Sequence, residues 1–332
     1  MAIGTLTACG NEVEETDINE AKYTEACALI ESGDYEKAYA AFKELGDYKD
    51  SQKYLSKFVF FPTVANYSFH DRSGVMTIEL GMYNMPSRML TEGVEGAESN
   101  AYTKDGVYTY DSKGNLMRQA VTYNGELMAF DYTYDDNNNL IKAEYSIGGV
   151  VHTVNGYVYD ENGLLIREYY TEGDVVHYDY ENSYDANGNM IGSVFKAPDG
   201  DHVYTYTYND EGNLINEQGT VPGEYCYNID YTYNADGRLM QKVRTENEED
   251  SYVITYTYDN AGNCIKEEAV LPDETKHIFE QEFDANGNVT KETQIAPDGT
   301  VETVEWQYAL TYLTIDVPAS TMKQIWGIFD IL

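Results

Sequence analysis

The stretch YTYTYNDEGNL, residues 204–214, contains the two signals that decide the fold: a period-two alternation of tyrosine and threonine, then a turn. Period two is the side-chain period of a β-strand, whose successive side chains point to opposite faces. Asn209 opens the turn with a side chain that bonds backbone donors two residues on, and Gly212 supplies the positive φ that such a loop needs. The stretch therefore predicts a β-hairpin with a tyrosine-lined face.

This turn recurs eight times at spacings of 24 or 25 residues. Its first residues are Asp111, Asp135, Asp160, Asp185, Asn209, Asn234, Asp259 and Asp284. An aromatic residue precedes every copy, an apolar residue stands five positions after each first residue, and the fourth position is glycine in all copies but one, where it is Asn138. A regular repeat of this length indicates a tandem array of one supersecondary unit. We expect each unit to form two strands, giving a curved antiparallel β-meander over residues 106–310.

The faces of this meander follow from the alternation. Each five-residue loop pairs the aromatic residue before it with the apolar residue after it, as in Tyr134 with Leu140. Two positions further out, this register predicts three tyrosine–cation pairs: Tyr132 with Lys142, Tyr157 with Arg167, and Tyr256 with Lys266. Sheets of this width curl, so we expect the tyrosine face on the concave side.

The repeated motif, Y-x-Y-D-x-x-G-N-L, resembles the YD-repeat (Rhs) family over about residues 106–310. The resemblance implies curved β shells in cell-surface proteins, with carbohydrate or toxin associations. Only the repeat scaffold is carried over to this chain, because the large toxin members of the family have many more repeats.

Flanking segments differ from the repeats. Apolar residues at helical spacing predict a small α-helical hairpin in residues 16–58, with Gly33 ending its first helix. Its run from Leu29 to Phe42 resembles a tetratricopeptide hairpin, and either a helical cap on the sheet or a peptide-binding groove fits it. Residues 59–105 are expected to be degenerate strands that lead into the repeats. Residues 311–332 are expected to form a final strand and a capping helix, which carries an apolar stripe of Met322, Ile325, Trp326 and Phe329.

The segment Leu6-Thr7-Ala8-Cys9-Gly10 resembles a bacterial lipobox. The resemblance implies a lipid on Cys9, with residues 1–15 as leader remnant and tether, and therefore an extracellular, lipid-anchored protein of a bacterial cell surface. The lipid is then the only membrane attachment expected.

Charge and cysteine usage exclude several classes of function. The formal net charge is -37, from 58 acidic and 21 basic residues, so we expect no nucleic acid as a partner. The four cysteines form no CxxC pair, and the Asp turns match no calcium loop, so no metal and no cofactor are predicted. The acidity indicates either surface solubility or cation binding, and the first is the simpler interpretation.

The chain contains 33 tyrosines, and no catalytic motif accompanies them. We therefore expect a protein without enzymatic activity. The rows away from the turns are the candidate stacking surface for a glycan or for another surface protein: Tyr108, Tyr132, Tyr206, Tyr231 and Tyr256. Two interpretations stay open, a binding module that uses these rows and a structural spacer or assembly component in which the tyrosines only pack.

Overall fold

The structure, a computed structural model, describes residues 11–96, 100–123, 125–197, 200–223, 225–246, 250–318 and 322. The lipobox with Cys9 lies outside the described residues. So does the C-terminal helical stripe, apart from Met322.

Three helices precede the sheet, as predicted: α1 (Asn11–Ser32), α2 (Tyr35–Leu45) and α3 (Ser51–Leu55). Gly33 adopts a φ of 78° directly after α1, the left-handed conformation typical of a helix end. Phe42 is fully buried between the helices, stacked on Tyr54 at 4.7 Å between ring centroids. None of the described helices is long and apolar enough to cross a lipid bilayer.

Twenty antiparallel strands and one short 3-10 helix make up the rest of the described chain. The first four strands and the 3-10 helix are β1 (Phe58–Ser68), β2 (Arg72–Leu80), η1 (Met82–Asn84), β3 (Pro86–Glu95) and β4 (Asn100–Tyr110). The next eight are β5 (Leu116–Tyr123), β6 (Glu126–Tyr134), β7 (Leu140–Ile147), β8 (Val150–Tyr159), β9 (Leu165–Glu172), β10 (Val175–Tyr184), β11 (Met190–Phe195) and β12 (His202–Tyr208). The last eight are β13 (Leu214–Val221), β14 (Tyr225–Tyr233), β15 (Leu239–Glu246), β16 (Asp250–Tyr258), β17 (Cys264–Val270), β18 (Lys276–Phe283), β19 (Val289–Ile295) and β20 (Val301–Tyr312).

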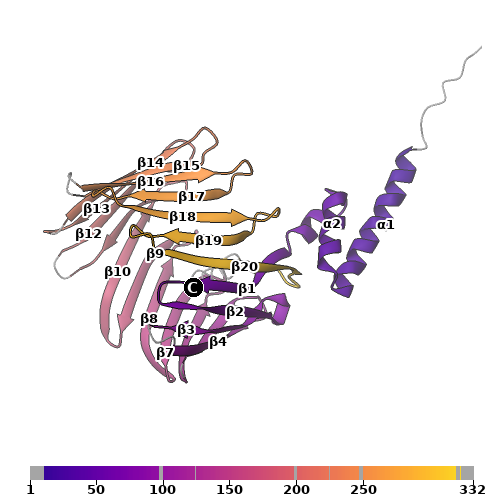
Figure 1. Cartoon of the computed structure of the whole chain (residues 1–332), viewed down its shortest axis with the longest axis horizontal. Coiled ribbons are helices and arrows are strands. Elements are labelled where there is room, and N and C mark those ends of the chain that lie inside the picture. Colours follow the sequence, from indigo (N-terminus) through magenta and orange to yellow (C-terminus); the bar gives the residue numbers. More distant parts are fainter. Residues whose placement is uncertain are drawn as a thin grey trace, which may run out of the picture.

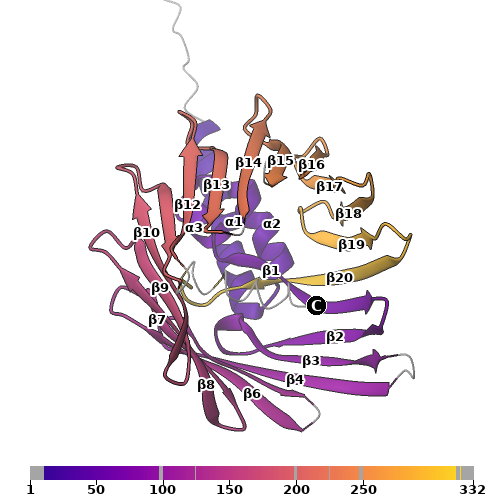
Figure 2. The same cartoon turned by 90° about the vertical axis from the view of Figure 1, so that its left-hand side faces the viewer.

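The sheet closes on itself. Each strand pairs with the next in sequence, and β1 also pairs with β20, from Phe58 opposite Tyr312 to Ser68 opposite Thr303. The result is a 20-stranded antiparallel β-barrel, whose strands surround an interior in Figure 2. The expected mainly-β hairpin array is confirmed, but the open curved meander is wrong. Closure leaves no strand edge exposed, which removes the aggregation hazard of a long open sheet.

The turns and the helices share one end of the barrel, which we call the turn rim. Even-numbered strands run towards this rim, and all eight repeated turns follow such strands. Strand β1 begins there and β20 ends there, so α1–α3 project from the same end (Figure 1). Tyr39 of α2 lies 5.5 Å from Phe58 between ring centroids, and Asn84 Nδ2 donates to Tyr35 Oη at 3.0 Å. The helices therefore pack on the barrel.

Alternation assigns the two faces of the sheet. In β12, Tyr204, Tyr206 and Tyr208 are half-buried, whereas Val203, Thr205 and Thr207 between them are exposed. Tyrosine-face residues of seven consecutive strands line one common cavity, so this is the concave, inner face. The tyrosine rows lie inside the barrel, as the curvature argument predicted.

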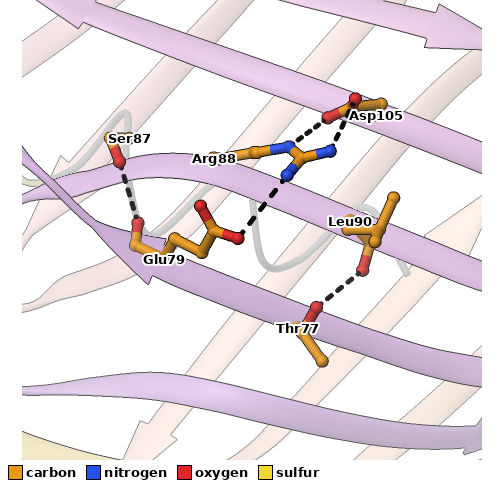
Figure 3. Close-up of polar contacts among 6 residues, drawn as sticks. All are labelled: Thr77, Glu79, Ser87, Arg88, Leu90 and Asp105. Carbon is orange, nitrogen blue, oxygen red and sulfur yellow. Dashed lines mark hydrogen bonds and ion pairs between the residues drawn. The ribbon is translucent and has the colours of Figure 1, made fainter.

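Outside the barrel, ion pairs connect neighbouring strands. Arg88 of β3 donates to both carboxylate oxygens of Asp105 on β4, at 2.8 and 3.0 Å, and lies 3.5 Å from Glu79 of β2 (Figure 3). The hydrogen bond from Arg88 lowers the pKa of Asp105. Arg118 on β5 pairs with Asp131 on β6 at 2.6 Å. Exposed pairs of this kind are screened by water and salt and stabilise the fold only weakly.

The repeated turn has a carboxylate at its centre. Asp185 Oδ1 accepts hydrogen bonds from the backbone N–H groups of Asn187 and Asn189, both at 2.8 Å, and its Oδ2 accepts from Asn189 Nδ2 at 2.9 Å. The side-chain bond from Asn189 is the main reason why the pKa of Asp185 is lowered. Gly188 adopts a φ of 85°, and Asn138 substitutes for glycine at a φ of 66°. The Asx-turn interpretation is confirmed.

A β-bulge follows every repeated turn, and a tyrosine hydroxyl bonds beside it. Tyr208 pairs with Leu214, but Thr207 pairs with Asn216, so one residue is inserted after the turn. Next to the equivalent bulge of the preceding unit, Tyr208 Oη donates to the carbonyl oxygen of Met190 at 2.9 Å. The same bond, from 2.7 to 2.9 Å, is formed by Tyr134, Tyr159, Tyr184, Tyr233 and Tyr258. Each of these six pre-turn tyrosines therefore connects its hairpin to the one before it.

Candidate functional site

The five candidate tyrosines all lie on the inner face, but in two groups. Tyr108 on β4 is buried, and the half-buried Tyr132 on β6 packs against it and Leu116. Tyr206, Tyr231 and Tyr256 lie on β12, β14 and β16 and are half-buried. Six strand spacings separate β6 from β12, roughly 29 Å along the sheet at ~4.8 Å per strand. The five residues therefore do not form one continuous surface.

The second group surrounds a carboxylate that the sequence did not single out. Glu217 on β13 pairs with Tyr206 on one side and with Ile229 on the other. Its Oε1 accepts a hydrogen bond from Tyr227 Oη at 2.7 Å, and its Oε2 accepts one from Tyr231 Oη at 3.0 Å. Both carboxylate oxygens are thus held by tyrosine hydroxyls. We call Glu217 with Tyr206, Tyr227, Tyr231 and Tyr256 the Glu217 cluster.

Two cations on β15 lie over the rings of this cluster. The Arg244 guanidinium carbon is 4.4 Å from the Tyr227 ring centroid, and Lys242 Nζ is 5.8 and 5.7 Å from those of Tyr231 and Tyr256. Cation–π attraction stabilises the rings in these positions. Glu246 pairs with Arg244 at 2.7 Å, so the positive charge is partly balanced.

Burial affects how these tyrosines titrate. Burial, followed by the negative charge of Glu217, raises the pKa of Tyr206 to about 12. Burial and the hydrogen bond to Glu217 raise the pKa of Tyr231 and of Tyr227 further. All three hydroxyls therefore remain protonated donors near neutral pH, which is the state needed to bond a carboxylate or the oxygens of a ligand.

A glycine makes room for one of the rings. Gly219 of β13 lies opposite Tyr227, and a Cβ added to it would be 2.1 Å from the Tyr227 ring. The ring therefore lies across the glycine backbone, where its hydroxyl reaches Glu217. The turn at Pro222-Gly223 joins β13 to β14. Pairing the residues of these two strands one by one, starting from the turn, places Glu217 opposite Ile229, between Tyr227 and Tyr231. That cross-strand count was the signal available in the sequence.

The three predicted tyrosine–cation pairs are wrong. Because the bulge shifts the register by one residue, Lys142 lies opposite Thr133, Arg167 opposite Val158, and Lys266 opposite Thr257. The partners of the tyrosines at this level are Ala143 for Tyr132, Glu168 for Tyr157, and Glu267 for Tyr256. The predicted cations point outwards, and the inner face carries acids at two of these positions.

Within the described part of the chain, no group of three or more His, Cys, Asp and Glu side chains is placed to hold a metal ion. Cys226 is exposed on β14, and Cys264 is half-buried on β17. The inner face around Glu217 presents aromatic rings, hydroxyl groups and a few charges.

Comparison with known proteins gives no family. No protein-family model matches the sequence, and no curated protein is similar to it. The YD-repeat and tetratricopeptide assignments therefore remain resemblances of sequence motifs.

Several solved structures show a distant likeness. One is a TcdB2–TccC3 toxin complex, at 14% identity and a TM-score of 0.35, over 80% of this chain and 18% of that chain. Another is the Tc holotoxin pore of Photorhabdus luminescens, at 13% identity and a TM-score of 0.30, over 68% of this chain and 17% of that one. A third is a porin-like protein from Bacteroides uniformis, at 13% identity and a TM-score of 0.31, over 75% of this chain and 98% of that chain. This chain thus spans less than a fifth of the length of those toxin chains, and at such low TM-scores nothing about its function follows from the likeness.

Proposed function

We propose that this chain is a non-catalytic binding protein of a bacterial cell surface, and that the Glu217 cluster binds a glycan inside the barrel. The observation that carries the proposal is the Glu217 carboxylate between Tyr227 and Tyr231, with the half-exposed rings of Tyr206 and Tyr256 beside it. Aromatic rings stack on the apolar faces of sugar rings, and oriented hydroxyls and carboxylates bond sugar hydroxyls.

The width of the barrel and the fixed spacing of its tyrosine rows both support this proposal. Twenty strands give an interior wider than side chains alone fill, because barrels of 16–18 strands already leave an aqueous channel. The inter-hairpin bonds of the pre-turn tyrosines fix the spacing of the rows. A preorganised row of rings loses little side-chain entropy on binding, which favours an extended ligand.

The alternative, a structural spacer or assembly component, has two observations in its favour. Tyr108 is 4% exposed and so is closed to a ligand. The pre-turn tyrosines also use their hydroxyls within the scaffold. If the spacer interpretation is correct, the Glu217 cluster only packs the inner face, and the partner is another protein held at the rim or by the helices. A lipid on Cys9 would place either kind of protein at the cell surface.

The test is a screen of the full chain against a printed oligosaccharide array. We expect selective binding that is lost in Tyr231→Ala, which removes a ring and one bond to Glu217, and in Gly219→Ala, which displaces the Tyr227 ring. Thr205→Ala is the matched control, because Thr205 is exposed on the outer face of β12 next to Tyr206. The spacer interpretation would be favoured if no oligosaccharide bound selectively, or if Thr205→Ala lost as much binding as the other two variants.

A further inference from the structure

A second region of the inner face contains a cavity of about 520 Å³, lined by strands β1 to β7. Its volume lies within the ~300–1,000 Å³ range of small-molecule sites. Met89, Val121, Met128 and Phe130 contribute an apolar wall, and Gln119 contributes an amide. Gly106, opposite Val121 and Met89, contributes only backbone to the lining.

A lysine side chain lies in this wall. Lys104 of β4 is half-buried, with its Nζ 5.6 Å from the ring centroid of Tyr102 and 5.5 Å from that of Tyr123. Among the described residues it forms no hydrogen bond or ion pair. Burial lowers the pKa of its ammonium group, and the nearby charge of Arg72 lowers it further. An anion beside Lys104 would relieve both effects.

The charge balance of the cavity is opposite to that of the chain. Arg72 and Lys104 both line it, and Glu95 of β3 lies directly opposite Arg72. Glu95 accepts a hydrogen bond from the Tyr123 hydroxyl and also acts on Lys104 through its charge. Two cations and no acid are therefore among the described residues that line the cavity, in a protein with 58 acidic and 21 basic residues. Positive charge beside an apolar wall favours an anionic ligand that has an apolar body.

We propose that this cavity binds a small organic anion with an apolar body, its carboxylate or sulfonate at Lys104 and its hydrocarbon part against Met89, Val121, Met128 and Phe130. The site is separate from the Glu217 cluster, because it lies on strands β1 to β7 rather than on β12 to β16. The proposal therefore stands independently of glycan binding.

The test uses two probes that share one aromatic body, 8-anilinonaphthalene-1-sulfonate and the uncharged N-phenyl-1-naphthylamine, titrated by fluorescence into the full chain. We expect one molecule of the sulfonate to bind per chain, more tightly than the uncharged probe. Lys104→Gln should weaken the sulfonate by about ten-fold, the loss of one charge-assisted bond, and leave the uncharged probe unchanged. Val121→Trp should fill the cavity and weaken both probes.

The matched control is Lys142→Gln, which removes an outer-face lysine paired with Glu144 at 2.8 Å. It should alter neither affinity. Circular dichroism checks that each variant keeps its sheet. The proposal is overturned if Lys104→Gln leaves sulfonate affinity unchanged, if it weakens both probes equally, or if Lys142→Gln has the same effect.

Discussion

The two halves of the barrel are stabilised differently. Strands β1 and β2, with neighbouring segments, build a buried core around Phe61, Met76 and Met85, against which Val317 and Met322 also pack. From β8 to β18, Val221 is the one buried apolar side chain among the described residues. There the repeated turns and the tyrosine hydroxyls hold the hairpins in register. The comparison shows that a regular repeat can replace a dry core with local polar bonds, whereas the irregular strands that close the barrel need apolar burial.

Substitutions in the core should have the largest effect. Phe61→Ala removes a fully buried ring of the first half, and we expect the free energy of unfolding to fall by about 3–5 kcal/mol. Phe279→Ala removes a half-buried ring from β18, where we expect a loss of about 1–2 kcal/mol. Urea titration followed by circular dichroism measures both. Equal losses would contradict the contrast between the halves.

Substitutions of the turn glycines should cause the next largest loss of stability. Gly188 has a φ of 85°, and a Cβ added to it would meet only Leu164 Cδ2, at an ordinary contact distance of 3.9 Å, so Gly188→Ala changes mainly the backbone preference. We expect a loss of about 1–2 kcal/mol in the free energy of unfolding, the cost of a left-handed alanine. Asn187→Ala in the same turn is the control, because Asn187 has no positive φ. A loss as large in the control would show that the turn depends on side chains instead.

The hydroxyl at the pre-turn position can be removed in one repeat and introduced in another. Tyr208→Phe should cost about 1 kcal/mol, because it leaves the Met190 carbonyl without its donor. Phe283 occupies the same position in the last repeat and has no hydroxyl, so Phe283→Tyr should gain about 1 kcal/mol through a bond to the Cys264 carbonyl. Thermal unfolding of both variants decides the matter, and a Phe283→Tyr protein less stable than the parent would count against the role assigned to these bonds.

The turn carboxylates should make stability depend on pH, with the smallest effect per residue. Hydrogen bonds lower the folded-state pKa of Asp135, Asp185 and Asp259 below the unfolded value of about 3.9. Their contribution is therefore full above that value and is lost as the pH falls through the lower, folded pKa. We expect the midpoint temperature of unfolding to decrease when the pH is lowered below about 4. Asp185→Asn should make this decrease slightly smaller. Asn209 and Asn234 already lack the carboxylate, so Asn209→Ala should leave the dependence unchanged.

Much of the repeat could be predicted from the sequence because its determinants are local. Asp185, Gly188 and Asn189 act within one loop, and the alternation around Tyr206 assigns a face without any knowledge of the neighbours. Closure depends instead on β1 pairing with β20, two segments without the motif and more than 200 residues apart. No periodicity connects them, and the open meander was therefore the natural but incorrect expectation.

The candidate site was predicted only in part. The tyrosines were assigned to the concave face, which the structure confirms, but the bulge after each turn shifted their partners by one residue. Glu217 was missed because a single acid among 58 has no distinguishing neighbours along the chain. Its position between Tyr227 and Tyr231 becomes apparent only when β13 and β14 are aligned from the turn at Pro222-Gly223 that joins them.

The closed barrel is the premise of both proposed sites, and the seam between β1 and β20 tests it most directly. Asn66 lies opposite Glu305 across this seam on the outer face. In a chain with its native cysteines replaced by serine, Asn66→Cys with Glu305→Cys should form an intramolecular disulfide on mild oxidation, since facing strand positions meet its geometry. Asn66→Cys with Glu280→Cys, three strands away, should not form one. Free thiols in the first pair, measured by intact mass, would contradict closure and leave an open sheet.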